Sequence, residues 1–446
     1  MRTRANSSAV PEALTRMLAS PRLAAALTYL ALGIAFSTHL LRSVMGWPGL
    51  LGALITLVIL AALSLGARRE SIEWHGLLPI SILVFVGWCA LSAIWSGYTI
   101  PTLAGIGYQL AFAFLAIYVA LVRDTIQIVR ATGDMLRVLL GISLALEVLS
   151  GLLLDLPITF LGIQGNITQF GPIQGVFGSR NVLGLISLIA AVTFVIELRA
   201  RSVRRGVGIG SICLAGIGLL LTGSPVIVVV ALFVGAAALA LYWLRRTPVE
   251  GRWMLQLGLL GTILFTGIAT WIARTRIIEL LNAGSEFQVR YTLWSEMWRL
   301  VSLNPLEGWG WAGLWPTDVT PYGWLGFVTT LDQSSGLNAF LDVYFQVGLV
   351  GFIAFLALIG LAFVRSWLLA SNKRPLVFAW PALILVVLLV TSTAESTILV
   401  EFGWLLLVIC AVKAAQGMSW RSALPRSPRS DLTRPGLTRP GPATGG

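Results

Sequence analysis

The feature that most constrains this chain is the recurrence of apolar stretches long enough to cross a lipid bilayer as helices. One crossing needs about 20 apolar residues. Hydrophobic residues make up 57% of the sequence and charged residues 11%, whereas soluble proteins carry about a quarter charged residues. Twelve stretches reach or approach the required length, at 22–42, 48–66, 76–95, 102–122, 134–154, 180–197, 207–221, 224–244, 253–272, 338–364, 375–393 and 395–413. The sequence therefore predicts an all-α, polytopic helical membrane protein with about 12 transmembrane helices.

The basic residues predict the orientation of these spans, because Arg and Lys accumulate in cytoplasmic loops. With both termini in the cytoplasm, 25 of the 31 basic residues fall on the cytoplasmic side. The chain then divides into a cytoplasmic N-terminal segment (1–21), a transmembrane domain (22–413) and a cytoplasmic tail (414–446). The tail is rich in Arg, Pro, Gly and Ser, a composition typical of disordered segments.

The net charge of +12 follows from the same cytoplasmic excess, which suits an anionic inner leaflet and does not indicate nucleic-acid binding. The three cysteines lie far apart inside predicted spans, without the spacing of a disulfide framework or a metal site. We therefore expect membrane lipids as partners, and no nucleic acid, metal or cofactor.

Two predicted extracytoplasmic segments stand out by their length, 155–179 and 273–336. The second precedes the tenth span and contains six of the 17 tryptophans. Within it, 288–302 has the periodicity of a helix with one apolar face, and Asn304-Pro305 predicts its end. The glycine–aromatic run 308–313 follows, where the backbone can approach a ligand closely.

Four motifs resemble those of the O-antigen ligase and polymerase superfamily, especially its exopolysaccharide-polymerase-like branch. They are Trp95-Ser96 with Pro101, the run from Gly175 to Gly184, the run from Arg290 to Gly310, and the run from Asn338 to Gly351. Their order, spacing and predicted side of the membrane also match the family over roughly residues 80–410.

The resemblance implies a metal-independent glycosyltransferase of the bacterial plasma (inner) membrane. Such an enzyme joins an undecaprenyl-diphosphate-linked glycan to an acceptor glycan or lipid on the extracytoplasmic side. Arginine suits this chemistry, because its guanidinium stays charged and matches phosphate oxygens. Charge on the diphosphate leaving group would be stabilised in this way.

The chain departs from the family pattern at two positions. Leu337 stands where the family usually has a histidine that activates the acceptor hydroxyl, and the only histidines are His39 and His75. Ser224-Pro225-Val226 stands where the family often has Ser-Arg-Thr, so one phosphate-binding arginine is missing. Both departures bear on whether histidine-dependent transfer is retained.

Candidate residues follow from the motifs, and each also has a plain structural interpretation. The candidates for substrate binding are Arg290, Arg180, Asn181, Trp294, Trp309, Gly310 and Trp311. The candidates for catalysis are Asn338, Asp342 and Glu395, because carboxylates inside a membrane usually face the bundle interior. The plain interpretations are interfacial anchoring for the arginines and tryptophans, and satisfied polar packing for Asn338 and the carboxylates. His39 is a much weaker candidate for a displaced base, since the plain interpretation is an interfacial histidine.

Two further classes of function remain open from the sequence. The chain could be a transporter or flippase of a lipid-linked glycan, although no inverted repeat with broken half-helices is visible. It could also be an inactive family member that scaffolds an assembly complex, which the missing histidine and arginine favour.

Overall fold

The computed structural model describes residues 12–69, 79–248, 251–272, 276, 284–329 and 334–418. Within these residues the protein is helical, and its one β-type pairing is an isolated bridge between Ile158 and Ile163. Most of the predicted tail 414–446, the first part of the segment 1–21, and 273–275, 277–283 and 330–333 of the predicted outer loop lie outside the described residues.

Each of the twelve apolar stretches overlaps a helix in the described part of the chain, and the stretch 22–42 runs from α2 into α3. The long elements are α2 (Pro21–Phe36), α3 (Thr38–Ala67), α4 (Ile80–Leu91), α5 (Thr99–Val122), α6 (Thr125–Val148), α7 (Arg180–Arg199), α8 (Arg205–Leu221), α9 (Pro225–Arg246), α10 (Arg252–Ile272), α14 (Ala339–Asn372), α15 (Ala379–Thr391) and α16 (Glu401–Gly417). Between and before them lie α1 (Glu12–Leu18), α12 (Gly284–Val301), α13 (Tyr322–Thr329) and the short turns η1 (Ser92–Ile94), η2 (Leu149–Leu154), η3 (Thr159–Leu161), η4 (Asn166–Gln169), η5 (Gly175–Phe177), η7 (Leu376–Phe378) and η8 (Thr397–Leu399). The helix predicted over 288–302 is α12.

Six described helices are long and apolar enough to cross a bilayer, which confirms the predicted class of all-α membrane protein. They are Thr38–Ala67, Thr99–Val122, Thr125–Leu154, Arg180–Arg199, Pro225–Arg246 and Ala339–Asn372. Four more apolar helices are shorter, at Pro21–Phe36, Ile80–Ile94, Arg205–Leu221 and Leu376–Thr391.

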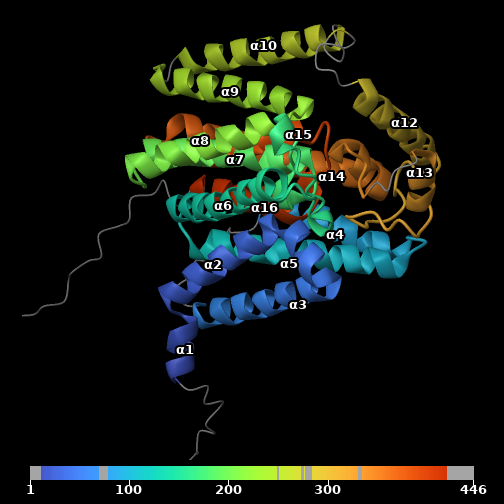
Figure 1. Cartoon of the computed structure of the whole chain (residues 1–446), viewed down its shortest axis with the longest axis horizontal. Coiled ribbons are helices and arrows are strands. Elements are labelled where there is room, and N and C mark those ends of the chain that lie inside the picture. The colour runs from blue at the N-terminus through green and yellow to red at the C-terminus, as the bar shows by residue number, and fades with distance from the viewer. Residues whose placement is uncertain are drawn as a thin grey trace, which may run out of the picture.

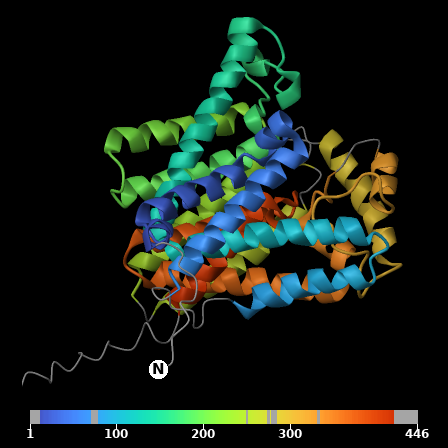
Figure 2. The same ribbon diagram turned by 90° about the horizontal axis from the view of Figure 1, so that it is seen from below.

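The helices form one bundle whose centre is α16. This helix packs against α2, α5, α14 and α15, and nearly all of its side chains are buried. The α9–α10 pair lies along one edge of the bundle and α2–α3 along the other (Figure 1). Both views show α12 and α13 gathered at one end, beside the ends of α4 and α5 (Figure 2). That end is where the candidate site residues lie.

Helix α14 is broken at Val347 and Gly348, where the backbone leaves the helical region (φ −126° and 65°). A break frees carbonyl and amide groups that need new partners, above all in an apolar environment. Three carbonyls find donors from elsewhere in the chain: Trp309 N donates to Phe345 O (3.1 Å), Gly310 N to Gln346 O (2.7 Å) and Trp88 Nε1 to Val347 O (2.9 Å).

The amides beyond the break bond to the same loop. Leu349 N donates to Pro305 O (3.0 Å) and Val350 N to Leu306 O (3.4 Å). The segment 305–310 is therefore docked onto the break through its backbone, and we call this contact the docked loop. Two of the motifs that suggested the family thus meet each other directly.

Buried tyrosines hold the far side of the docked loop. The Tyr98 and Tyr322 hydroxyls lie 2.8 Å apart, and their oxygens lie 3.0 and 3.2 Å from Gly310 O. One hydroxyl donates to the other, which donates to the carbonyl. Burial raises the pKa of both phenols, so their hydroxyls keep the proton needed for donation at any physiological pH.

We predict that Gly348→Ala destabilises the protein by about 2 kcal/mol or more. The positive φ disfavours any side chain, and a Cβ there would meet the carbonyl of Leu306. The matched control is Gly360→Ala in the same helix, where a Cβ meets nothing within 4 Å. The control should be stabilised by about 0.5–1 kcal/mol. Thermal unfolding in detergent measures both, and similar midpoints for the two variants would contradict the docking.

Candidate functional site

A cavity of about 300 Å³ opens among the starts of α3, α7 and α16. Its lining residues come from these three helices, from the turn before α7 and from the loops around 313–314, 334–337 and 395–400. The polar members that matter below are Thr38, His39, Arg42, Ser179, Glu395, Ser396 and Glu401. Because α7 and α16 begin at the cavity, it has the positive ends of two helix dipoles.

A chain of hydrogen bonds reaches this cavity at Glu395 and joins four segments of the protein. Ser224 Oγ donates to Asn181 Oδ1 (2.7 Å), and Asn181 Nδ2 donates to Glu395 Oε1 (2.7 Å). Arg290 Nη2 donates to the same Glu395 oxygen at 3.1 Å, an ion pair with both side chains largely buried. We call this series the Ser224–Arg290 chain.

Local sequence sets the position of each member of the chain. Ser224 caps α9 at its N-terminus, where Pro225 follows as the first helical residue. Asn181 is the second residue of α7, which Ser179 caps. Arg290 projects from α12 and is 8% exposed. The other terminal nitrogen of its guanidinium, Nη1, donates to the carbonyls of Ala394 and Leu337.

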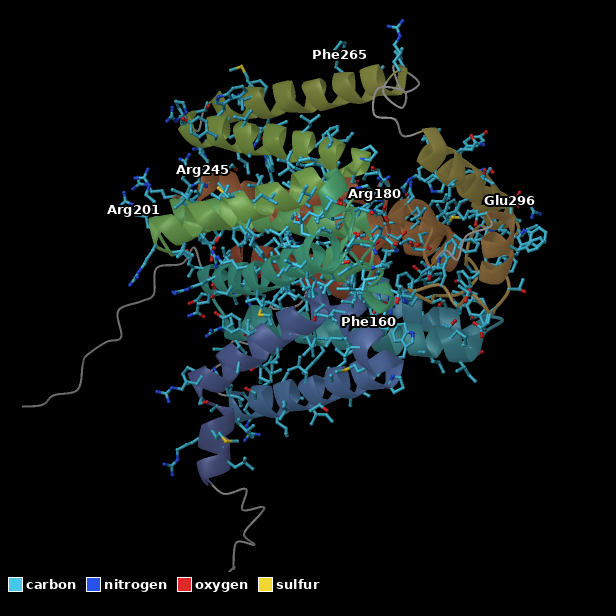
Figure 3. The ribbon with its side chains drawn as sticks, in the orientation of Figure 1. Phe160, Arg180, Arg201, Arg245, Phe265 and Glu296 are labelled. Atoms are coloured by element: carbon cyan, nitrogen blue, oxygen red, sulfur yellow. The ribbon has the colours of Figure 1, made fainter. Side chains whose placement is uncertain are left out.

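Arg180 is the first residue of α7 and is half-buried beside Asn181. Figure 3 shows Arg180 at the end of the bundle nearest α12, whereas Arg201 and Arg245 lie at the opposite end. The sequence-predicted residues Arg180, Asn181, Arg290 and Glu395 are thus brought to one end of the structure.

Asn338 has a complete structural role in the described part of the chain. Its Oδ1 accepts from Phe340 N (3.0 Å) and Leu341 N (3.2 Å), which makes it the N-cap of α14. Its Nδ2 donates to Thr393 O at 3.2 Å. Asn338 therefore ties the start of α14 to the loop after α15.

Asp342 is fully buried, does not line the cavity, and has both carboxylate oxygens engaged. Oδ1 accepts from Trp315 Nε1 (2.9 Å) and Gln346 Nε2 (2.8 Å), and Oδ2 accepts from Gly336 N (3.0 Å). These bonds attach Trp315 and Gly336 to the start of α14. Of the two predicted catalytic carboxylates, Glu395 lines the cavity.

The tryptophan candidates pack against neighbouring parts of the structure, and the cavity's lining does not include them. Trp294 Nε1 donates to Gly336 O (2.9 Å), and Trp309 Nε1 donates to Leu300 O (3.2 Å). Trp311 is fully buried, with its ring edge-on to Phe85 at 5.8 Å. Gly310 belongs to the docked loop.

The cavity also contains polar residues that the motifs did not single out. Glu401 accepts from Thr38 Oγ1 (2.6 Å) and Tyr108 OH (3.1 Å). Arg42 is half-buried, with its guanidinium 5.1 Å from the ring of Trp47. A signal for Arg42 was present in the sequence, because it is one of only six basic residues outside the predicted cytoplasmic segments.

Leu337, at the family's histidine position, lines the same cavity as His39. Its backbone is left-handed (φ 50°), a conformation that leucine seldom adopts. Among the described residues, no group of three or more His, Cys, Asp or Glu side chains is placed to hold a metal ion.

These features define a polytopic α-helical membrane protein with a polar cavity at one end of its bundle. No protein-family model matches the chain, and no curated protein matches it.

We predict that Asp342→Asn destabilises the protein by about 1–3 kcal/mol, because an amide nitrogen would face one of three hydrogen-bond donors. The control is Glu296→Gln, which loses a surface pair with Arg299 (2.9 Å) and should change stability by less than about 1 kcal/mol. Denaturant unfolding in detergent compares the two. A fully stable Asp342→Asn variant would argue against the structural role.

Proposed function

We propose that this protein joins a glycan carried on undecaprenyl diphosphate to an acceptor glycan or lipid. In this proposal the protein crosses the bacterial plasma membrane twelve times, with both termini in the cytoplasm. The cavity then faces the extracytoplasmic side, and the segment 273–336 is the large outer loop beside it.

The observation that carries the proposal is the Ser224–Arg290 chain. Asn181 and Arg290 belong to two separate motifs of the family resemblance, and Glu395 bonds to both of them beside one cavity. Leu337 precedes a third motif, and its carbonyl oxygen accepts a hydrogen bond from Arg290 Nη1 at 3.3 Å. Motifs that are far apart in sequence therefore meet around one guanidinium.

The electrostatics of the cavity suit a diphosphate. Helix N-termini favour anions through their free amides and their dipoles, and α7 and α16 begin at the cavity. Arg42 lines it, and Arg290 lies directly behind Glu395. As the glycosidic bond breaks, negative charge grows on the diphosphate oxygen, and these groups would stabilise it.

The distribution of arginines supports the proposed orientation. Arg245 donates to the carbonyls of Ala370 and Arg374 at the end of the bundle opposite to the cavity, and Arg201 lies at that end too (Figure 3). Concentration of basic residues at one end is the pattern of a cytoplasmic face.

We predict that Arg290→Ala lowers glycan transfer by about 100-fold, which is the usual effect of removing a donor that stabilises developing charge. Arg290→Lys should recover part of the loss, because it keeps the charge without the forked geometry. The control is Arg299→Ala in the same helix, whose exposed side chain pairs with Glu296. The assay uses proteoliposomes with undecaprenyl-diphosphate-linked oligosaccharide and measures chain growth and released undecaprenyl diphosphate.

Other outcomes would overturn the proposal. A folded Arg290→Ala variant as active as wild type would remove Arg290 from the site. Movement of the lipid-linked glycan across the liposome membrane without a new bond would instead identify a transporter. Absence of both activities in the wild type would favour an inactive scaffold.

A further inference from the structure

His39 is the one imidazole that the described residues bring to the cavity, near the start of α3. Its Nδ1 lies 3.2 Å from Val176 O. A carbonyl only accepts, so Nδ1 must carry the proton and donate it. In the neutral ring this leaves Nε2 with a free lone pair.

The imidazole ring of His39 packs against the turn before α7. Gly178 has a positive φ (79°), and a Cβ there would collide with the His39 ring. The buried carboxylate of Glu147 stabilises the same turn, because its Oε1 accepts from Gln174 N (3.1 Å) and Gly175 N (2.8 Å). It thereby helps to position the carbonyl of Val176, to which Nδ1 of His39 donates.

The two carboxylates of the cavity are held by hydrogen bonds. Glu395 Oε1 accepts from Asn181 and from Arg290, with which it forms an ion pair, and both oxygens of Glu401 accept, from Thr38 and Tyr108. Within the described part of the chain, His39 Nε2 makes no hydrogen bond. A base near neutral pH with an available lone pair is what activation of a hydroxyl requires.

We propose that His39 is the catalytic base of the cavity, in place of an imidazole at position 337. This inference rests on the proposed glycan transfer. The acceptor hydroxyl gives its proton to His39 Nε2, and its oxygen bonds to the anomeric carbon of the donor glycan. The bond from that carbon to the diphosphate oxygen breaks, and its electron pair leaves with the diphosphate. The imidazolium then returns its proton to water or to the released diphosphate.

Three charged residues line the cavity together with this base. Arg42 lies on the same helix, Glu401 at the start of α16 and Glu395 in the loop before it. The base must be neutral to act, so transfer is lost as the pH falls through the pKa of the imidazole, whose ordinary value is about 6.5.

The test is the glycan-transfer assay with His39→Asn, whose amide can still donate to Val176 O but offers no basic nitrogen. We expect kcat to fall about 100-fold or more, with little change in the binding of the lipid-linked glycan. The acidic fall in the pH–rate profile should disappear in this variant. Added imidazole should restore activity to His39→Ala, and His75→Asn, at the only other histidine, should behave as wild type.

The failures can be told apart. A His39→Asn variant that keeps wild-type kcat and the acidic fall overturns the role of His39 while transfer itself stands. Loss of activity in His39→Ala that imidazole does not restore, with a lowered unfolding midpoint, assigns His39 a structural role and also overturns the inference. If wild-type protein forms no glycan bond, both proposals fall.

Discussion

The break in α14 is the constraint on which this end of the molecule depends. An interrupted helix in an apolar environment must find a partner for every freed carbonyl and amide, and the docked loop together with Trp88 supplies those partners. Docking fixes where α12 ends, and thereby where Arg290 meets Glu395. A backbone requirement in one helix thus determines the geometry of a cavity formed by others.

Hydropathy predicted the helices well, because burial in lipid demands long apolar runs whatever their partners are. The site was less accessible to sequence reasoning. The pairing of Arg290 with Glu395 joins residues 105 positions apart, and no local pattern encodes such a contact. The spacing of Asn338 and Asp342 correctly put both on one end of α14, but their partners come from Gly336, Trp315 and Thr393. Only the three-dimensional structure shows these partners, which give Asn338 and Asp342 contacts that their spacing did not predict.

The charges at the cavity are balanced in a way that composition could not reveal. Two carboxylates, Glu395 and Glu401, stand at the site proposed for an anion. Glu395 is matched by Arg290, and Glu401 by hydroxyl donors and the nearby Arg42. An incoming diphosphate would therefore compete with Glu395 for one guanidinium. Glu395 would then keep only the hydrogen bond from Asn181, and this loss opposes binding.

The left-handed backbone at Leu337 has a consequence for the adaptability of the site. Asparagine, aspartate and histidine occupy this region several times more readily than other residues with side chains. The loop conformation is thus better suited to an imidazole than to the side chain it bears. At position 337 the backbone conformation suits a histidine, and only the side chain differs. A Leu337→His substitution would give the cavity a second imidazole without a change in the backbone conformation.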